Sequence, residues 1–434
     1  MKTYRFHSIP PAGNKIPPAL LLRALWQAKP QPPAMLFAGN LGVNLDVNRN
    51  VLFLSSGRAA LWLTLKAASR LQTRRQEVIV PAYTCPAVVS AVLKAGLQPV
   101  LCDINLEDFG YLPEALADTV SERTLAVVAV HLFGYPCALG RVLDIARRSG
   151  SYAIEDAAQA FGNPPVRRGG PGYRPGFEAD AGFFSFGRGK PLSVLHGGVL
   201  IASSEDLYHE ALRIYGNLNR SGRFQALRYS AYLAAYWLFW RPSLYWIPSS
   251  IPFLHLGETL FEKDFLIRRG LPSAGSVLAN LMHSLERELQ TRSATAAWYS
   301  ERLGSLPGLF LPPDPAYPYL RYPLVAATNE LRDRILCELS NRGFKSAVLY
   351  PAPLNELPRL REVLQDTRVY PNAHSLSSRL VTLPLHSGLS HEDRSRLLEA
   401  IRKACAAPPC AGAESDPAGS ASSRELAKRE RGCR

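Results

Sequence analysis

The stretch Asp180–Gly198 reads D-A-G-F-F-S-F-G-R-G-K-P-L-S-V-L-H-G-G. It predicts a short aromatic strand followed by a turn in which Gly187, Gly189 and Pro191 surround Lys190. A lysine on such a turn is commonly a solvent-exposed loop residue. Schiff-base chemistry, in contrast, requires an amine on a fixed stem, in surroundings apolar enough to lower its pKa. The turn alone leaves both interpretations open.

Apolar strands alternate with helices along the chain before this turn. Strands are predicted at residues 52–54, 77–81, 99–104, 125–132 and 152–156, with helices beginning near residue 59 and at 87–95, 112–120 and 139–149. Strands rich in Val, Leu and Ile that alternate with helices indicate a parallel sheet covered on both faces. Ligands bind outside the carboxyl ends of such strands. Gly57, Tyr83, His131 and Asp156 each lie just beyond a predicted strand end, which makes them candidate site residues.

The composition is that of an ordinary globular protein. The 434 residues are 47% hydrophobic and 20% charged, which fits one large domain or two of intermediate size. The net charge of +14 favours an anionic partner, such as nucleic acid, an anionic membrane or a phosphorylated substrate. Because no basic block is interleaved with aromatic residues, nucleic acid is not expected. The seven cysteines include no C-x-x-C pair, so we expect neither a zinc site nor disulfides, and a cytoplasmic location.

The chain divides into four parts by composition. We expect an N-terminal arm over residues 1–50, a large domain over 51–270, a small C-terminal domain over 271–405 and a disordered tail over 406–434. The small domain is predicted to contain a helix at 286–303, strands near Tyr322 and Val348, and a final helix at 390–404.

Two features suggest polar chemistry at the strand ends. Glu155 and Asp156 are consecutive strand residues, so their side chains point to opposite faces and only one can face a ligand. A carboxylate beside a pyridine nitrogen would keep that nitrogen protonated, although a strand-end acid can also simply cap a helix. The turn Ser55–Gly57 opens a helix, where free backbone N–H groups attract anions, but serine is also an ordinary N-cap.

Taken together, six motifs resemble a known family. They are S-S-G-R-A-A-L, V-P-A-Y-T-C-P-A, K-A-G-L-Q-P-V-L-C-D-I, V-H-L-F-G-Y-P, I-E-D-A-A-Q-A-F-G and F-F-S-F-G-R-G-K-P-L. Their order and spacing are similar to those of the DegT/DnrJ/EryC1/StrS aminotransferases, which are pyridoxal-phosphate (PLP) enzymes of fold type I. The resemblance covers residues 50–205, 271–306 and 348–404. It implies an α/β fold, with a large domain built on a mostly parallel sheet and a smaller α+β domain.

The resemblance implies roles for individual residues. Lys190 matches the lysine that forms a Schiff base with PLP, and Asp156 matches the acid on the pyridine nitrogen. Gln159 matches the glutamine beside the cofactor's hydroxyl edge, and Ser185 matches the phosphate-binding serine. Lys190 also argues against relatives that carry histidine there and dehydrate their substrates.

At three positions the chain departs from the family pattern. Gly57 and Arg58 occupy the phosphate turn, where the family usually has Gly-Thr, although arginine suits a phosphate well. Cys85 stands where many members have an aromatic residue that stacks on the PLP ring, so either Cys85 or Tyr83 is expected to face the ring. His196 stands where glutamate is frequent, and we assign it no role.

The implied activity is ping-pong transamination. An amino acid, usually glutamate in the family, gives its amino group, which passes to a nucleotide-linked keto-sugar in amino-sugar or polysaccharide biosynthesis. The family implies a homodimer. Two alternatives remain open on the same fold: another PLP enzyme, such as a lyase or desulfurase, or a non-catalytic regulator or membrane-surface protein.

Residues 206–270 form an aromatic-rich insertion that departs most from the family. Asn217 and Asn219 match poorly the asparagine that reaches into the partner subunit in relatives. The run Tyr229–Trp240 is too short to span a bilayer. Tyrosine and tryptophan favour membrane interfaces, so residues 229–246 form either a subunit contact or a peripheral membrane contact.

Overall fold

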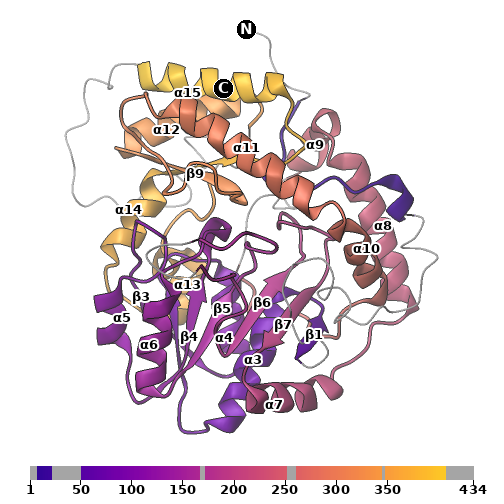
Figure 1. The fold of residues 1–434 in the computed structure, drawn as a ribbon, viewed down its shortest axis with the longest axis vertical. Helices are drawn as coiled ribbons and strands as arrows, with labels where there is room; N and C mark the ends of the chain where they lie inside the picture. The colour runs from indigo at the N-terminus through magenta and orange to yellow at the C-terminus, as the bar shows by residue number, and fades with distance from the viewer. Residues whose placement is uncertain (1–6, 22–49, 167–171, 252–260, 345–347, 407–434) are drawn as a thin grey trace.

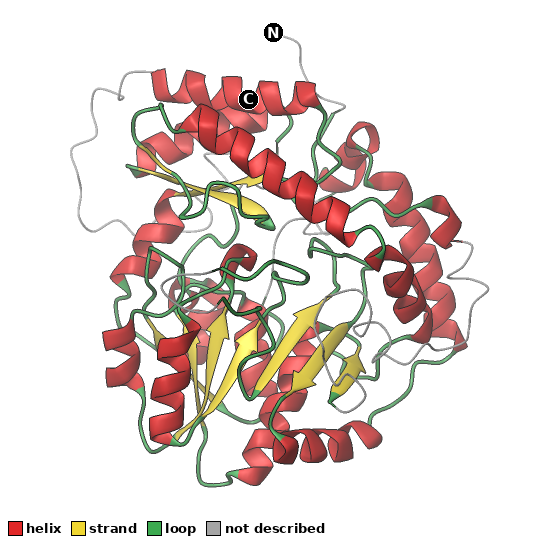
Figure 2. Ribbon diagram, in the orientation of Figure 1, coloured by secondary structure: helices red, strands yellow, loops and turns green. Residues whose placement is uncertain are grey.

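The computed structural model describes residues 7–21, 50–166, 172–251, 261–344 and 348–406. All of the predicted tail at 406–434 except Ala406, which ends a helix, and most of the predicted arm at 1–50 therefore lie outside the described residues. Two sheets organise the chain, a large one in the lower half of Figure 1 and a small one above it. Figure 2 shows helices around both.

The large sheet has seven strands in the order β1-β7-β6-β5-β4-β2-β3. Their bounds are β1 (Val51–Leu54), β2 (Glu77–Pro81), β3 (Gln98–Cys102), β4 (Thr124–Val130), β5 (Tyr152–Asp156), β6 (Ala181–Ser185) and β7 (Gly198–Ala202). Strands β3, β2, β4, β5 and β6 are parallel, whereas β7 runs antiparallel to both of its neighbours, β6 and β1. The predicted α/β architecture with a mostly parallel sheet is confirmed.

Helices cover both faces of this sheet. The connecting helices are α3 (Gly57–Leu71), α4 (Pro86–Lys94), α5 (Pro113–Thr119) and α6 (Leu139–Ser149). On β2, Val78 and Val80 share a buried cluster with residues of α3 and α4, whereas Ile79 shares one with residues of α5 and α6. Side chains of a strand alternate between the two faces of the sheet, so one apolar strand packs against the helices on both faces.

The small sheet is antiparallel, with β9 between β8 and β10. Its strands are β8 (Leu309–Phe310), β9 (Arg321–Ala326) and β10 (Leu380–Pro384). The helices of this part of the chain are α10 (Pro272–Met282), α11 (Leu285–Leu303), α12 (Asn329–Asn341), α13 (Pro358–Leu364), α14 (Pro371–Arg379) and α15 (His391–Ala406), of which α10 packs on strands of the large sheet. The amide of Leu320 donates to the carbonyl of Phe133 at 2.8 Å, in the short helix η1 (Leu132–Gly134) that follows β4. The small sheet is thereby joined to the carboxyl edge of the large one.

The strand predicted near Val348 is wrong for the described residues 348–350, which have no regular structure. The backbone of Tyr350 pairs with a side chain instead. Its amide donates to the Tyr83 hydroxyl at 3.4 Å, and that hydroxyl donates to the Tyr350 carbonyl at 3.1 Å. Pro351 and Pro353 follow directly, and they lack the N–H that a sheet ladder needs.

The insertion is mostly helical up to Ser249. It contains α7 (Glu205–Gly216), α8 (Arg223–Phe239) and α9 (Pro242–Ser249). Most of the 12-residue aromatic run Tyr229–Trp240 therefore lies in α8, which is longer than the run. Over the part of the chain that the structure describes, none of the helices combines the length and apolarity needed to cross a membrane.

Glu155 is fully buried and accepts four hydrogen bonds. One carboxylate oxygen accepts from the amides of Glu178 and Ala179, at 2.7 and 2.9 Å. The other accepts from the Gly176 amide at 2.7 Å and lies 2.9 Å from Nε2 of His131. Glu155 thus fastens the segment leading to β6 onto β5.

His131 completes this buried group at the end of β4. Burial by itself lowers the pKa of His131, but Cys137 and Glu155 beside the ring outweigh burial and raise the pKa to about 10. A protonated imidazole and an ionised carboxylate stabilise each other where neither would be stable alone.

We expect Glu155→Gln to lower the free energy of unfolding by about 3 kcal/mol, because an amide cannot accept from three backbone N–H groups and His131 together. Urea unfolding followed by circular dichroism measures this. Glu114→Gln, at an exposed position of α5, is the control and should change stability by less than about 0.5 kcal/mol. Equal stability of the two variants would contradict the role of Glu155.

Candidate active site

Asp156 ends β5 on the face opposite to Glu155 and is buried. Its Oδ1 accepts a hydrogen bond from the Ala158 amide at 3.0 Å. Burial raises the pKa of Asp156, while Lys190, the Ala158 amide and His131 act in the opposite direction. Asp156 ends β5 and Lys190 follows the neighbouring strand β6, so the predicted amine acts on the predicted acid although 34 residues separate them in sequence.

Lys190 lies on the turn after β6 and is half-buried. Its amide donates to the carbonyl of Gly187 at 3.4 Å, and Gly189 adopts a positive φ of 72° that glycine tolerates. The Lys190 ammonium acts electrostatically on both Asp156 and Cys85. The turn thus presents one cation to a buried acid and a thiol.

Two side chains from distant parts of the chain hold the loop after Lys190. Arg292 on α11 donates to the Pro191 carbonyl at 2.9 Å, and the Asn14 Oδ1 accepts from the Ser193 amide at 2.5 Å. Arg292 is only 1% exposed, and its Nε lies 3.4 Å from the Glu288 carboxylate. Burial lowers the pKa of Arg292, and Glu288 opposes that effect. Sequence reasoning missed both side chains.

The turn that opens α3 approaches the end of β6. The Ser56 hydroxyl caps α3 by accepting from the Ala59 amide at 3.2 Å. Gly57 packs so closely on Ser185 that an added Cβ would lie 2.8 Å from the serine Cβ. The free N–H groups of the first turn and the Ser185 hydroxyl therefore converge, which is an arrangement that binds phosphate.

Arg58, predicted beside the phosphate, has other partners in the structure. Its guanidinium lies 2.8 Å from the Glu262 carboxylate and 4.7 Å from the centre of the Phe265 ring. Its role as a phosphate ligand stays a prediction.

Tyr83 and Cys85 have different surroundings. Tyr83 is buried with its ring edge-on to that of Tyr350, at 5.5 Å between centroids. Cys85 lies just before α4, where burial raises the pKa of the thiol, Lys190 lowers it and Asp156 raises it. Of the two residues predicted to face the cofactor ring, Cys85 is the one on which Lys190 and Asp156 act.

Tyr350 is a site residue that sequence reasoning missed. It is buried, its hydroxyl accepts from Nε2 of Gln159 at 3.3 Å, and it contacts the Cys85 side chain. Gln159 also accepts from the Phe133 amide at 3.0 Å, where Phe133 has a positive φ of 58°. The only sequence signal for Tyr350 was that the resemblance resumes near residue 348.

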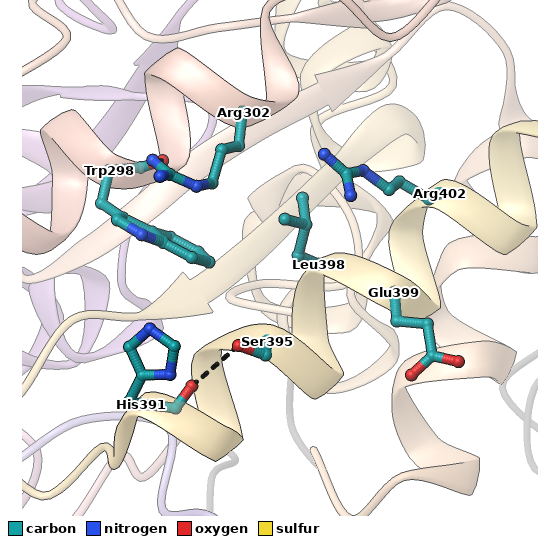
Figure 3. Close-up of a pocket in the computed structure, with 7 residues that line it drawn as sticks. All are labelled: Trp298, Arg302, His391, Ser395, Leu398, Glu399 and Arg402. Carbon is teal, nitrogen blue, oxygen red and sulfur yellow. Dashed lines mark hydrogen bonds between the residues drawn. The ribbon is translucent and has the colours of Figure 1, made fainter.

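A hollow between α11 and α15 is separate from this site (Figure 3). It is lined by Trp298, Arg302, His391, Ser395, Leu398, Glu399 and Arg402. The Arg302 guanidinium lies 4.5 Å from the centre of the Trp298 ring, and the Ser395 hydroxyl donates to the His391 carbonyl at 3.1 Å. None of the predicted cofactor residues belongs to it.

Two proteins with similar sequences are named as sugar aminotransferases. The chain is 27% identical over 372 residues to dTDP-4-dehydro-2,3,6-trideoxy-D-glucose 4-aminotransferase of Saccharopolyspora spinosa, covering 85% of this chain and 87% of that protein. It is 28% identical over 350 residues to UDP-N-acetyl-3-dehydro-alpha-D-glucosamine 3-aminotransferase of Acidithiobacillus ferrooxidans, covering 80% and 82%.

Solved structures share the fold. DesV of S. venezuelae superposes with a TM-score of 0.68 at 24% identity, covering 90% of this chain and 94% of its own. DesI superposes with a TM-score of 0.70 at 23% identity, covering 98% and 96%. These likenesses confirm fold type I.

The family comparison decides between the activities that the sequence left open. The model of the DegT/DnrJ/EryC1/StrS aminotransferase family matches residues 30–231 and 273–402, which is most of the chain. Transamination thereby replaces the alternatives of a lyase, a desulfurase and a non-catalytic regulator. The chain belongs to the DegT/DnrJ/EryC1/StrS family and is a PLP-dependent aminotransferase.

Proposed function

We propose that this aminotransferase moves an amino group from an amino acid, with glutamate as the donor, to a nucleotide-linked keto-sugar in amino-sugar or polysaccharide biosynthesis. The names of the relatives support a nucleotide-sugar acceptor, because one acts on a dTDP-sugar and another on a UDP-sugar. The observation that carries the proposal is that buried Asp156 ends β5 and Lys190 follows the neighbouring strand β6, so the ammonium acts on the carboxyl.

The residues of the site fit PLP. Gly57, which leaves no room for a side chain against Ser185, and the first turn of α3 would hold the phosphate. Asp156 would pair with the pyridine nitrogen, and Cys85 would face the ring. When bound, PLP supplies an electron sink that makes the alpha proton of the amino donor acidic.

Lys190 has two tasks in this site. Its amine would hold the cofactor covalently. As a free base, the same amine would accept the proton from the donor's alpha carbon. The reverse transfer serves the keto-sugar in the second half of the ping-pong cycle. Arg292 and Asn14 fix the backbone on the C-terminal side of Lys190, so the amine returns to the same position after each transfer.

We also propose that the enzyme is a homodimer, as the family resemblance implies. Light scattering of the purified protein tests this state. A screen of dTDP-, UDP- and GDP-linked keto-sugars with glutamate tests the acceptor and donor, and turnover of keto acids alone would contradict the sugar assignment.

We expect borohydride to attach PLP irreversibly to Lys190, because reduction traps a Schiff base at the lysine that forms it. Peptide mass spectrometry after reduction identifies the site. Lys190→Ala should bind PLP weakly and never become labelled. Label on any other lysine of the parent protein would overturn the assignment of Lys190.

We expect Asp156→Asn to slow the half-reaction with glutamate by roughly three orders of magnitude, about 4 kcal/mol on the barrier. The amide keeps the shape but not the charge that holds the pyridine nitrogen protonated. Single-turnover absorbance measures the rate, and borohydride labelling of Lys190 should persist. A variant within tenfold of the parent would exclude Asp156 as this partner.

We expect the double variant Glu288→Gln/Arg292→Met to label Lys190 more slowly with borohydride, because the Pro191 carbonyl loses its donor. The Glu288→Gln substitution avoids leaving Glu288 as a buried, unpaired charge once Arg292 is removed. Arg287→Met, at an exposed position of the same helix, is the control. Equal labelling rates in the three proteins would show that Arg292 does not position the loop.

A further inference from the structure

Helix α8 has two different faces. Tyr229, Ser230, Leu233 and Trp240 are buried against the protein. On the other side Phe224 and Leu227 are 73% and 64% exposed, which is unusual for large apolar side chains. Ala231, Tyr232, Ala234, Ala235 and Leu238 are also exposed, and together with Phe224 and Leu227 they form what we call the outer face of α8.

The inner face holds α8 firmly in place. Gly13 of the N-terminal segment packs on Tyr236 and Trp240, where an added Cβ would lie 2.6 Å from the tyrosine hydroxyl. The Trp240 ring lies 5.0 Å from that of His386. Leu233 belongs to a buried cluster with residues of β6, β7 and α10. Figure 1 places α8 at the outer edge of the molecule. The outer face is therefore a fixed surface of the folded protein.

The surroundings of the outer face carry positive charge. Between Glu210 and Glu258 the sequence has no acidic residue, and it has five arginines, at positions 213, 220, 223, 228 and 241. Arg228 is exposed among the outer-face residues, and Arg241 lies 4.5 Å from the centre of the Trp237 ring. Neither arginine has an ion pair within the described residues.

These observations select one occupant for the outer face. A two-fold contact would bring the same patch of two copies together, so Arg228 would meet the corresponding stretch of the second copy, which has no acidic residue from 211 to 257. An anionic lipid surface, in contrast, offers apolar chains to Phe224 and Leu227 and negative headgroups to the arginines. Tyr232, which belongs to the outer face, is a residue type that favours the headgroup level.

We propose that the outer face of α8 docks this enzyme onto an anionic membrane surface. The 17-residue helix lies flat along the interface, with its apolar side chains among the upper acyl chains and its arginines at the headgroups. The enzyme then binds reversibly, and salt weakens the attachment because it screens the arginines.

Sedimentation of the full-length, PLP-loaded enzyme with lipid vesicles tests this. We expect it to sediment with phosphatidylcholine vesicles that contain phosphatidylglycerol, much less with pure phosphatidylcholine, and less at high salt. Phe224→Ser/Leu227→Ser and, separately, Arg228→Glu/Arg241→Glu should each lower the partition coefficient about tenfold or more.

The controls carry the same chemical changes away from α8. They are Phe310→Ser at an exposed position of β8 and Arg141→Glu at an exposed position of α6, and both should bind vesicles like the parent. Light scattering follows the oligomeric state of every variant. Absence of binding to phosphatidylglycerol vesicles at low salt, or equal binding to neutral vesicles, would overturn the proposal. So would a Phe224→Ser/Leu227→Ser variant that dissociates into monomers while still binding vesicles, because the outer face would then be a subunit contact.

Discussion

Two neighbouring buried carboxylates at the end of β5 are the constraint on which the rest of the structure depends. A buried carboxylate is stable only when donors or cations surround it. Because strand side chains alternate, Glu155 and Asp156 must each find such partners on a different face of the sheet. Glu155 takes three backbone amides and His131, which fixes the path of the chain into β6. Asp156 is left for the ligand side, where the charge of Lys190 opposes the effect of burial on its pKa.

The position of Lys190 depends on contacts that cross the whole molecule. Asn14 lies 179 residues before Ser193, and Arg292 lies 101 residues after Pro191. One belongs to the N-terminal segment and the other to a helix that packs with the small sheet. The active-site turn is therefore complete only when the two sheets are docked. Burying the Arg292 guanidinium with a single carboxylate partner costs desolvation free energy, although it holds the Pro191 carbonyl in place. Such a cost is consistent with the precision that proton transfer by Lys190 requires.

One face of helix α8 in the insertion packs on the protein, and the opposite face is exposed. The helix uses aromatic and hydroxyl side chains to bind the body of the protein, and it leaves large apolar side chains on the outside. An exposed apolar surface beside arginines has no stabilising role in the isolated chain, since water solvates it poorly. Covering this surface with a lipid layer or another molecule would remove the unfavourable contact with water.

The sequence by itself determined the elements and the candidate residues at their ends. Val- and Leu-rich strands alternating with helices specify a parallel sheet, and the carboxyl ends of parallel strands meet at one edge, so Gly57, Tyr83, His131 and Asp156 could be grouped before any coordinates were known. The same local reasoning located α6 and β5 at their observed bounds.

Only the tertiary structure decided which side chains complete the site. Tyr350, Asn14 and Arg292 stand in stretches without a local signal, because their partners are more than 100 residues away. Local pattern also failed at Val348, where an apolar run resembles a strand but the Tyr83 hydroxyl satisfies the adjacent backbone. Periodicity records which face of an element is apolar, whereas the partner of a buried polar group depends on how distant elements pack, and that is set by the whole chain.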